Sequence, residues 1–118
     1  LISKIVSECA GMDIPVNMPI VGRNVFSQKL DIHVRACLKD PLAFQPFAPS
    51  LFGQVQHIVV GKGTGVYALR AKLRELQIGA DLSDQQLSAA LVDIWRLAEK
   101  NKRCLSADEL KEIIKKRI

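Results

Sequence analysis

The chain has 118 residues, 48% of them apolar and 25% charged, which is typical of one small globular domain or a piece of a larger protein. No apolar run approaches the roughly 18 residues that span a bilayer, and no leader opens the chain, so we expect a cytoplasmic protein without a membrane partner. The net charge of +5 is spread along the chain and points only weakly to a phosphate-bearing partner, either nucleic acid or a coenzyme A ester.

The first predicted element is an amphipathic helix that is already under way at the first residue. Apolar residues recur at helical spacing over positions 1–9, and Gly11 is a plausible stop. Because the first residue is not methionine and no capping residue precedes the helix, we expect a fragment cut from a longer polypeptide, whose upstream part covers the apolar face.

Two prolines interrupt the helical pattern after this point. Pro15 and Pro19 exclude helix at and before their positions, and residues 20–22 are predicted to form a short extended piece that ends in a turn. We therefore expect a linker that packs against the rest of the chain.

A second helix is predicted from about Gln28 to Lys39, with the Ser27 hydroxyl as its cap and Asp40-Pro41 at its end. Its predicted inner face consists of Leu30, Val34, Cys37 and Leu38. His33 lies at the edge of this face. Because imidazole titrates near neutral pH, His33 is a candidate proton carrier; the alternative is a partly buried ring that donates to a backbone carbonyl.

A proline-rich loop over residues 42–52 carries three of the four phenylalanines. Burying each ring is worth roughly 1.5 to 3 kcal/mol, so Phe44 and Phe47 are expected to be buried, either against the helices or in a small core of the loop itself.

A β-branched run over residues 56–60 predicts a strand that ends in a glycine-rich turn at 61–65. A dinucleotide fingerprint would need glycine where Val66 stands, and a P-loop would need a longer loop before its lysine. What remains is a Thr64 cap on the following helix. Plain turn geometry is one interpretation of the glycines, and a modest affinity for an anion is the other.

Three amphipathic helices with short connections are predicted over residues 63–118, and they should form a compact bundle. Gly79 is expected to close the first helix, and two capping boxes, Ser83 with Gln86 and Ser106 with Glu109, start the others. The predicted inner faces consist of Val66, Leu69, Leu73 and Leu76, then Leu87, Leu91, Ile94, Leu97 and Ala98, and finally Leu110, Ile113 and Ile114.

The three cysteines, Cys9, Cys37 and Cys104, form no close pair. This spacing argues against a disulfide framework and against a zinc cluster. We expect reduced, mostly buried thiols and no metal ligands in this chain.

Between Ile14 and Leu76 the chain contains a series of short motifs that match a known pattern, and the match continues more loosely over the last two helices. The motifs are Ile14-Pro15-Val16-Asn17, Pro19-Ile20-Val21-Gly22, Asn24-Val25-Phe26, Ile32-His33-Val34, Leu38-Lys39-Asp40-Pro41, Phe47-Ala48-Pro49, Gly53, Val59-Val60-Gly61-Lys62, Thr64-Gly65 and Ala68-Leu69. Together they resemble the C-terminal region of the homocitrate synthase and 2-isopropylmalate synthase family. That family commonly reads His-Glu-Ser-Gly-Ile-His over positions 28–33, so Asp31 replaces a glycine and is expected to perturb the start of its helix.

The resemblance implies a mainly α fold, the C-terminal subdomains of a TIM-barrel acyltransferase. Its implied parts are residues 1–13, the end of a helix from the missing barrel part; residues 14–62, a linker subdomain with the His33 helix and one short strand; and residues 63–118, a three-helix subdomain. Enzymes of this family join acetyl-CoA to a 2-oxo acid, and the transferred acyl group becomes an alkyl group. The reaction takes place on a barrel that holds a divalent metal. The matched region crosses to the other subunit of a dimer and covers its active site.

In that family a histidine at the place of His33 is taken to work as a catalytic acid or base. The implied partners are an upstream TIM-barrel domain or separate barrel subunit and a second copy of the enzyme. The fragment alone is expected to bind neither acetyl-CoA nor metal and to be inactive. Lys29 and Arg35 could add positive potential near a carboxylated substrate or could be solvated surface residues.

Several alternatives stay open at this point. Within the family, a homocitrate synthase of the nitrogen-fixation type, with 2-oxoglutarate as acceptor, fits a chain that stops at Ile118, and a 2-isopropylmalate or citrate synthase is the other reading. Outside the family, the chain could be a non-catalytic helical interaction or regulatory module with a structural His33. Nucleic-acid binding through the basic helix faces is disfavoured, because charges of both signs alternate and no aromatic platform accompanies them.

Overall fold

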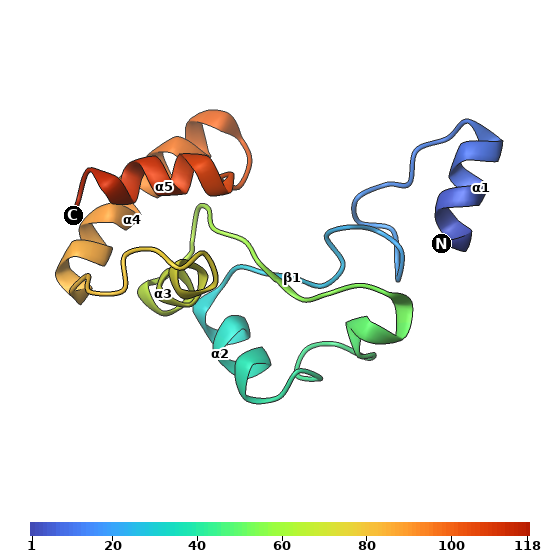
Figure 1. The fold of residues 1–118 in the computed structure, drawn as a ribbon, viewed down its shortest axis with the longest axis horizontal. Coiled ribbons are helices and arrows are strands. Elements are labelled where there is room, and N and C mark those ends of the chain that lie inside the picture. The colour runs from blue at the N-terminus through green and yellow to red at the C-terminus, as the bar shows by residue number, and fades with distance from the viewer.

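The computed structural model describes residues 1–118 and contains five α-helices, one 3-10 helix and two short strands. In chain order these are α1 (Ile2–Ala10), β1 (Ser27–Gln28), α2 (Asp31–Lys39), the 3-10 helix η1 (Pro49–Phe52), β2 (His57–Ile58), α3 (Val66–Glu75), α4 (Asp84–Asn101) and α5 (Ala107–Lys115). Figure 1 shows α1 at one end of the molecule and α3, α4 and α5 gathered at the other. The predicted mainly α fold class is therefore confirmed.

The principal core lies among α3, α4 and α5. Its buried members are Val60, Leu69, Leu73, Leu82, Leu87, Ala90, Leu91, Ile94, Leu110 and Ile114. Both predicted capping boxes are present: the Ser83 hydroxyl accepts from the Gln86 N–H, the Gln86 side chain accepts from the Ser83 N–H, and Ser106 and Glu109 repeat the arrangement. Each box satisfies N–H groups that the first turn of a helix leaves free, which explains why these two boundaries fall where the sequence predicts them.

The predicted closure of α3 at Gly79 is wrong. The helix ends at Glu75, and Gln77 takes a left-handed conformation with a φ of 56°. The Ile78 N–H then donates to the Leu73 carbonyl at 3.0 Å, which satisfies one of the last carbonyls of the helix. Gly79 is also left-handed, but it belongs to the connection toward α4.

The second helix begins later than predicted because the residues before it are needed for a sheet. Residues 27 and 28 form β1, which pairs in parallel with β2, Ser27 opposite His57 and Gln28 opposite Ile58. Because Gln28 is extended and pairs with Ile58, no helix can begin directly after Ser27, and α2 starts instead at Asp31 after Leu30. Of the predicted strand at 56–60, only residues 57 and 58 pair in the ladder.

A second, smaller core joins this ladder to the helices. It consists of Val34 from α2, Ile58 from β2 and Ala68 from α3, all buried. Because the three residues come from three elements, their contact fixes α2 and β2 against the start of α3.

The segment that joins α1 to β1 consists of turns. The first helix ends at Gly11, as predicted. The expected extended piece at 20–22 is wrong: Ile20 has a φ of 67°, and the Gly22 N–H donates to the Met18 carbonyl at 2.8 Å, which closes a turn. The Gln54 amide donates to the carbonyl of Ile20, so this linker is held to the segment before β2.

The expected burial of Phe44 and Phe47 is also wrong. Their exposed fractions are 64% and 47%, whereas Phe26, just before β1, is buried at 3%. Phe47 packs edge-on against Phe52 with ring centroids 5.7 Å apart, so the two rings bury only part of one another.

Exposed apolar side chains concentrate in the N-terminal half. Of the large hydrophobic residues that are exposed, all but Val92, Trp95 and Ile118 precede residue 56. The radius of gyration is 15.9 Å, compared with about 13.5 Å for a compact domain of this length. The chain therefore has a packed helical end and an open end whose apolar surface is available to another protein body.

Candidate functional site

His33 is the third residue of α2 and lies half-buried at the surface. Its ring faces Phe44, with centroids 4.5 Å apart and planes at 48°. Neither ring nitrogen is hydrogen-bonded within the chain, so the arrangement is not that of an imidazole tied to a backbone carbonyl. A half-exposed imidazole with both nitrogens free can exchange a proton with a group brought to it from outside.

The predicted inner face of the His33 helix is half right. Val34 and Cys37 are buried, whereas Leu30 and Leu38 are exposed at 41% and 55%. The helix starts three residues later than predicted and packs on α3 through only a narrow stripe. The side of α2 that carries His33 is consequently open.

The loop after α2 is folded back so that Phe44 reaches His33. The Cys37 thiol donates to the Ala43 carbonyl at 3.0 Å, and the Asp40 carboxylate accepts from the Leu42 N–H, also at 3.0 Å. Phe44 itself has a φ of 58°, a left-handed conformation that non-glycine residues adopt only when their surroundings hold them there. The two hydrogen bonds hold Leu42 and Ala43, the residues immediately before Phe44.

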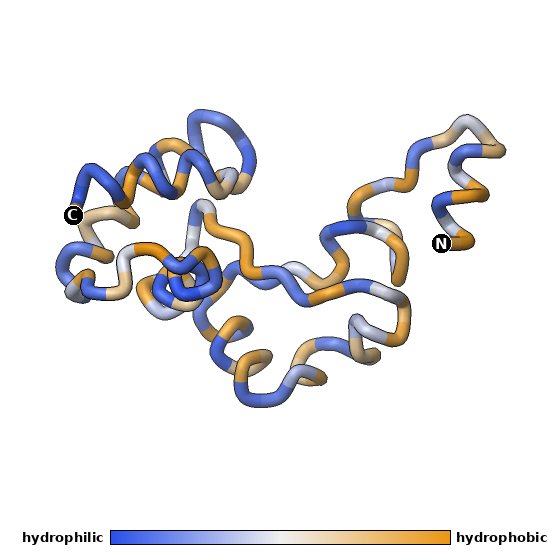
Figure 2. Tube along the Cα trace, in the orientation of Figure 1, coloured by the Kyte–Doolittle hydropathy of each residue, from blue (hydrophilic) through white to orange (hydrophobic).

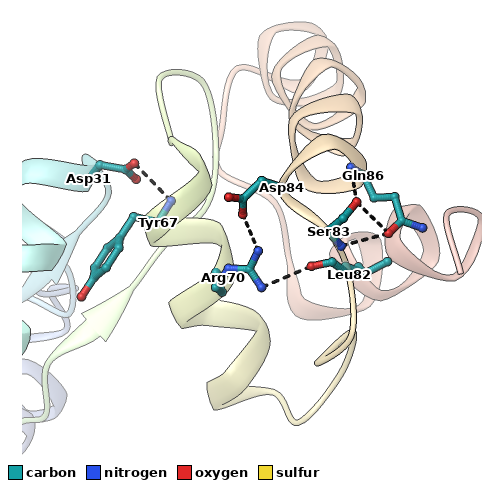
Figure 3. Close-up of polar contacts among 7 residues, drawn as sticks. All are labelled: Asp31, Tyr67, Arg70, Leu82, Ser83, Asp84 and Gln86. Atoms are coloured by element: carbon teal, nitrogen blue, oxygen red, sulfur yellow. Dashed lines mark hydrogen bonds and ion pairs between the residues drawn. The ribbon is translucent and has the colours of Figure 1, made fainter.

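Asp31 binds the start of α3. Its carboxylate accepts from the Tyr67 N–H at 3.1 Å and from the Ala68 N–H at 2.8 Å, as Figure 3 shows for Tyr67. The expectation that Asp31 perturbs the start of its own helix is wrong, because α2 begins regularly at this residue. An aspartate in the first turn also suits the positive end of the helix dipole.

Arg35 and Lys29 have different surroundings. The Arg35 guanidinium lies 4.3 Å from the centroid of the Tyr67 ring, which is a cation–π contact between α2 and α3. Lys29 lines a separate cavity of about 370 Å³ whose other charged residues are Lys62, Glu99, Lys102 and Arg103.

Two carboxylates offset part of the positive charge in this basic cavity. Lys62 pairs with Glu99 at 2.7 Å, and this contact lowers the pKa of the Glu99 carboxyl below its usual value. Arg103 pairs with Glu109 at 2.7 Å. Lys29 and Lys102 form no ion pair, so the cavity keeps a positive balance that is chemically suited to an anion.

The glycine-rich turn before α3 is a structural turn, and the predicted Thr64 cap is wrong. The Thr64 hydroxyl is fully buried and accepts from the Gly61 N–H at 3.0 Å. The residue that precedes α3 is Gly65, which has no side chain to cap the helix. The Thr64 carbonyl accepts from the Trp95 indole at 3.0 Å, so Trp95 packs at the margin of the bundle.

The chain brings together no group of three or more His, Cys, Asp or Glu side chains that could hold a metal ion. These donors therefore do not fit a divalent metal centre. The thiols are free, but the expectation that they are mostly buried is wrong: Cys9 is exposed, Cys37 is buried and Cys104 is intermediate. No helix of the structure has both the length and the apolar character needed to cross a membrane.

An apolar groove of about 780 Å³ lies beside α1. Its lining is mostly hydrophobic and includes Leu1, Ile2, Val6, Met12, Ile14, Met18, Ile20, Val21, Leu51 and Phe52. No residue of α1 is buried, and Figure 2 shows hydrophobic positions repeating along this helix. Such a surface is typical of one that packs against another protein body.

The chain thus combines a small helical bundle, a half-exposed histidine and an extended apolar surface. Residues 20–102 match the family described as "Homocitrate synthase post-HMGL domain-like". The chain belongs to this family, and the resemblance inferred from its motifs is confirmed.

Three similar proteins indicate the range of the family. Homocitrate synthase AksA of Methanothermobacter thermautotrophicus is 39% identical over 101 residues, which cover 86% of this chain and 25% of that protein. The putative (R)-citramalate synthase CimA of Methanopyrus kandleri is 36% identical over 91% of this chain and 21% of its own length. The 2-isopropylmalate synthase of Methanocaldococcus jannaschii is also 36% identical, over the same shares of the two chains. The chain thus spans about a quarter of the length of these relatives.

Two residues near His33 have structural surroundings that the sequence analysis did not foresee. Phe44 is expected from the sequence to be buried, either against the helices or in a small core of its loop, and nothing local in the sequence signals its left-handed backbone. Asp31 was recognised only as a departure from the glycine of the family motif. The signal for its contact with α3 was Gly65. A helix that follows a glycine has no side-chain cap of its own, so its first N–H groups need an acceptor from another part of the chain.

Proposed function

We propose that this chain is the C-terminal part of an acyltransferase that condenses acetyl-CoA with a 2-oxo acid, and that His33 is its proton-transferring residue. The observation that supports this best is the position of His33, an imidazole with free nitrogens on the open side of α2, within the matched part of the chain. In this proposal the chain is inactive alone, since acetyl-CoA and the divalent metal are held by the barrel of the complete enzyme.

The chemistry asks for a group that His33 can supply. Forming a carbon–carbon bond at the acetyl methyl requires removal of a proton next to the thioester carbonyl, and the oxygen of the attacked ketone must gain a proton. An imidazole near neutral pH can accept the first proton or donate the second. In both cases the ring must reach the reacting atoms from outside their own domain, which its exposure permits.

The first test substitutes His33 in the full-length synthase. His33→Ala and His33→Gln should lower kcat by about 10² to 10⁴-fold, the usual contribution of a positioned acid or base, while circular dichroism and the thermal midpoint stay unchanged. His57→Gln is the matched control, because His57 is the chain's other histidine and is exposed on β2. Unaltered turnover in both His33 variants would instead favour a non-catalytic interaction module.

We propose 2-oxoglutarate as the acceptor, as in a homocitrate synthase, on the strength of relatives that carry this name. The test measures release of the coenzyme A thiol by the full-length protein with 2-oxoglutarate and with the acceptors that would yield citramalate and isopropylmalate. The highest kcat/KM should be found with 2-oxoglutarate. A preference for one of the other acceptors would reassign the substrate and leave the role of His33 standing.

We also propose that the apolar groove beside α1 packs on the barrel and that His33 serves the active site of the other subunit of a homodimer. The exposed apolar surface of residues before 56 supports this arrangement. Mixing a His33→Ala protein with a protein inactivated at its barrel metal ligands should restore activity, since some mixed dimers contain one intact site. No recovery after subunit exchange would contradict the sharing of the site.

A further inference from the structure

The start of α3 is capped by a residue from another helix. An N-cap side chain normally accepts from the second or third N–H of its helix, and Gly65, which precedes α3, has no side chain for this. The second and third residues of α3 are Tyr67 and Ala68, and their N–H groups donate to the two carboxylate oxygens of Asp31. Asp31 therefore caps the start of α3, which Gly65 cannot do.

The fit between Asp31 and Gly65 is specific. A Cβ atom added at Gly65 would lie 2.3 Å from Oδ2 and 2.5 Å from Cγ of Asp31, far inside contact distance. Gly65 has an extended backbone with a φ of −98°, which an alanine can adopt, and the three atoms nearest to an added Cβ all belong to the Asp31 carboxyl group. The Asp31 carboxylate thus requires a residue without a side chain at position 65, in addition to its hydrogen bonds with α3.

The same contact determines where His33 stands. Asp31 is the first residue of α2 and His33 the third, so both belong to one helical turn. Arg35 on Tyr67 and the buried pair Val34 and Ala68 join α2 to α3 beside the carboxylate. Removing the carboxylate leaves these contacts but frees the first turn of α2, where the imidazole is attached.

We propose that Asp31 is a positioning residue for His33. By holding the first turn of α2 on the start of α3, the carboxylate sets the position of the imidazole relative to the substrate. The inference rests on the proposed role of His33. A displacement of about 1 Å at a catalytic group can cost on the order of 10²-fold in rate, so loss of this contact should be visible in kcat.

The test compares variants of the full-length synthase at a temperature well below unfolding. Asp31→Ala should lower kcat by about 10- to 100-fold with KM changed less than about twofold, because both carboxylate oxygens already accept from N–H groups of α3. Asp31→Asn should recover only part of the loss, since its single amide oxygen can accept from one of the two N–H groups while its NH2 group faces the other. Asp108→Ala is the matched control: Asp108 also lies in the first turn of a helix, α5, and is exposed, so its kcat should equal that of the wild type.

A double-mutant cycle tests the geometry. Gly65→Ala should lower kcat alone, by displacing the carboxylate, and should have no further effect when Asp31 is already alanine. If Asp31→Ala is too unstable to assay, Gly65→Ala and Asp31→Asn keep the comparison available. Additive effects of the two substitutions, or wild-type kcat in Asp31→Ala alongside an inactive His33→Ala, would overturn the inference while the proposed function stands. Full activity in His33→Ala would refute the proposed function itself.

Discussion

Replacing Thr64 with valine should destabilise the fold by removing one buried hydrogen bond. Thr64 is fully buried, and its hydroxyl accepts from the Gly61 N–H at 3.0 Å. Valine has nearly the same shape, so the substitution opens no cavity. It leaves the Gly61 N–H buried without a partner, which costs about 1 to 3 kcal/mol.

Thr64→Ser is the matched comparison because it keeps the hydroxyl and loses one methyl group. Deletion of a buried methyl costs about 1 kcal/mol. The serine variant should therefore be the more stable of the two, although it removes more apolar volume. The order of the two variants separates the contribution of the hydrogen bond from that of apolar packing.

Urea unfolding followed by tryptophan fluorescence measures both variants. Trp95 is the chain's one tryptophan, and its indole donates to the Thr64 carbonyl at 3.0 Å, so its emission reports on this turn directly. With an m-value of about 1.5 kcal/mol/M, the valine variant should unfold at a midpoint lower by roughly 0.7 to 2 M with an unchanged slope. A valine variant as stable as the wild type, together with a weaker serine variant, would refute the reasoning.

Three further predictions concern the helical bundle. Ser83→Ala and Ser106→Ala should each cost about 1 kcal/mol in urea unfolding, and the double variant should show their sum because the caps belong to different helices; a loss confined to one of them would contradict equal capping. Ile94→Ala should cost about 2 to 5 kcal/mol, since Ile94 is fully buried in the principal core, and a loss below 1 kcal/mol would mean that the core collapses around it. The Arg103 guanidinium and the Ser106 N–H lower the pKa of Glu109 to about 2 from the usual 4.5. Because the folded pKa is the lower one, this carboxylate stabilises the fold above about pH 4.5 and loses that contribution as the pH falls toward 2. Glu109→Gln should flatten that part of the stability profile, measured as thermal midpoints between these pH values.

The starts of α4 and α5 could be predicted from the sequence because their causes lie within a few residues. Ser83 and Ser106 each have their capping partner three positions ahead, so the signal and the structure occupy the same short window. The bundle faces followed from helical spacing for the same reason. Local hydrogen bonds and periodicity are sufficient where no distant segment competes for the backbone.

The start of α2 could not be predicted in this way, because a distant segment decides it. Ser27 is a good N-cap by composition, yet its backbone pairs with His57, thirty residues later. A sheet of two residues per strand leaves almost no periodic signal in either segment. The error is therefore one of non-local pairing, and the same cause hides the contact of Asp31 with α3.

The surroundings of His33 could not be predicted from the sequence, because they depend on a backbone conformation that has no local signal. The helix and the histidine were found from local pattern and from the family motif. Phe44 has a left-handed backbone and follows a turn in which the Cys37 thiol binds the Ala43 carbonyl and the Asp40 carboxylate binds the Leu42 N–H, whereas hydrophobicity alone predicted burial for this ring. Hydrophobicity predicts that an aromatic ring packs against other residues, but it does not predict which residues these are.

The position of His33 in the molecule explains why its helix needs an anchor from outside. Residues from Val60 onward contain the whole principal core, while most exposed apolar side chains precede residue 56. Helix α2 lies between these two parts and has only nine residues, too few to be stable by itself. Contacts with α3 give it the rigidity of the bundle, while its other side, with the imidazole, stays open to whatever covers the apolar surface. A proton-transferring group that must serve an active site outside its own domain needs both properties at once.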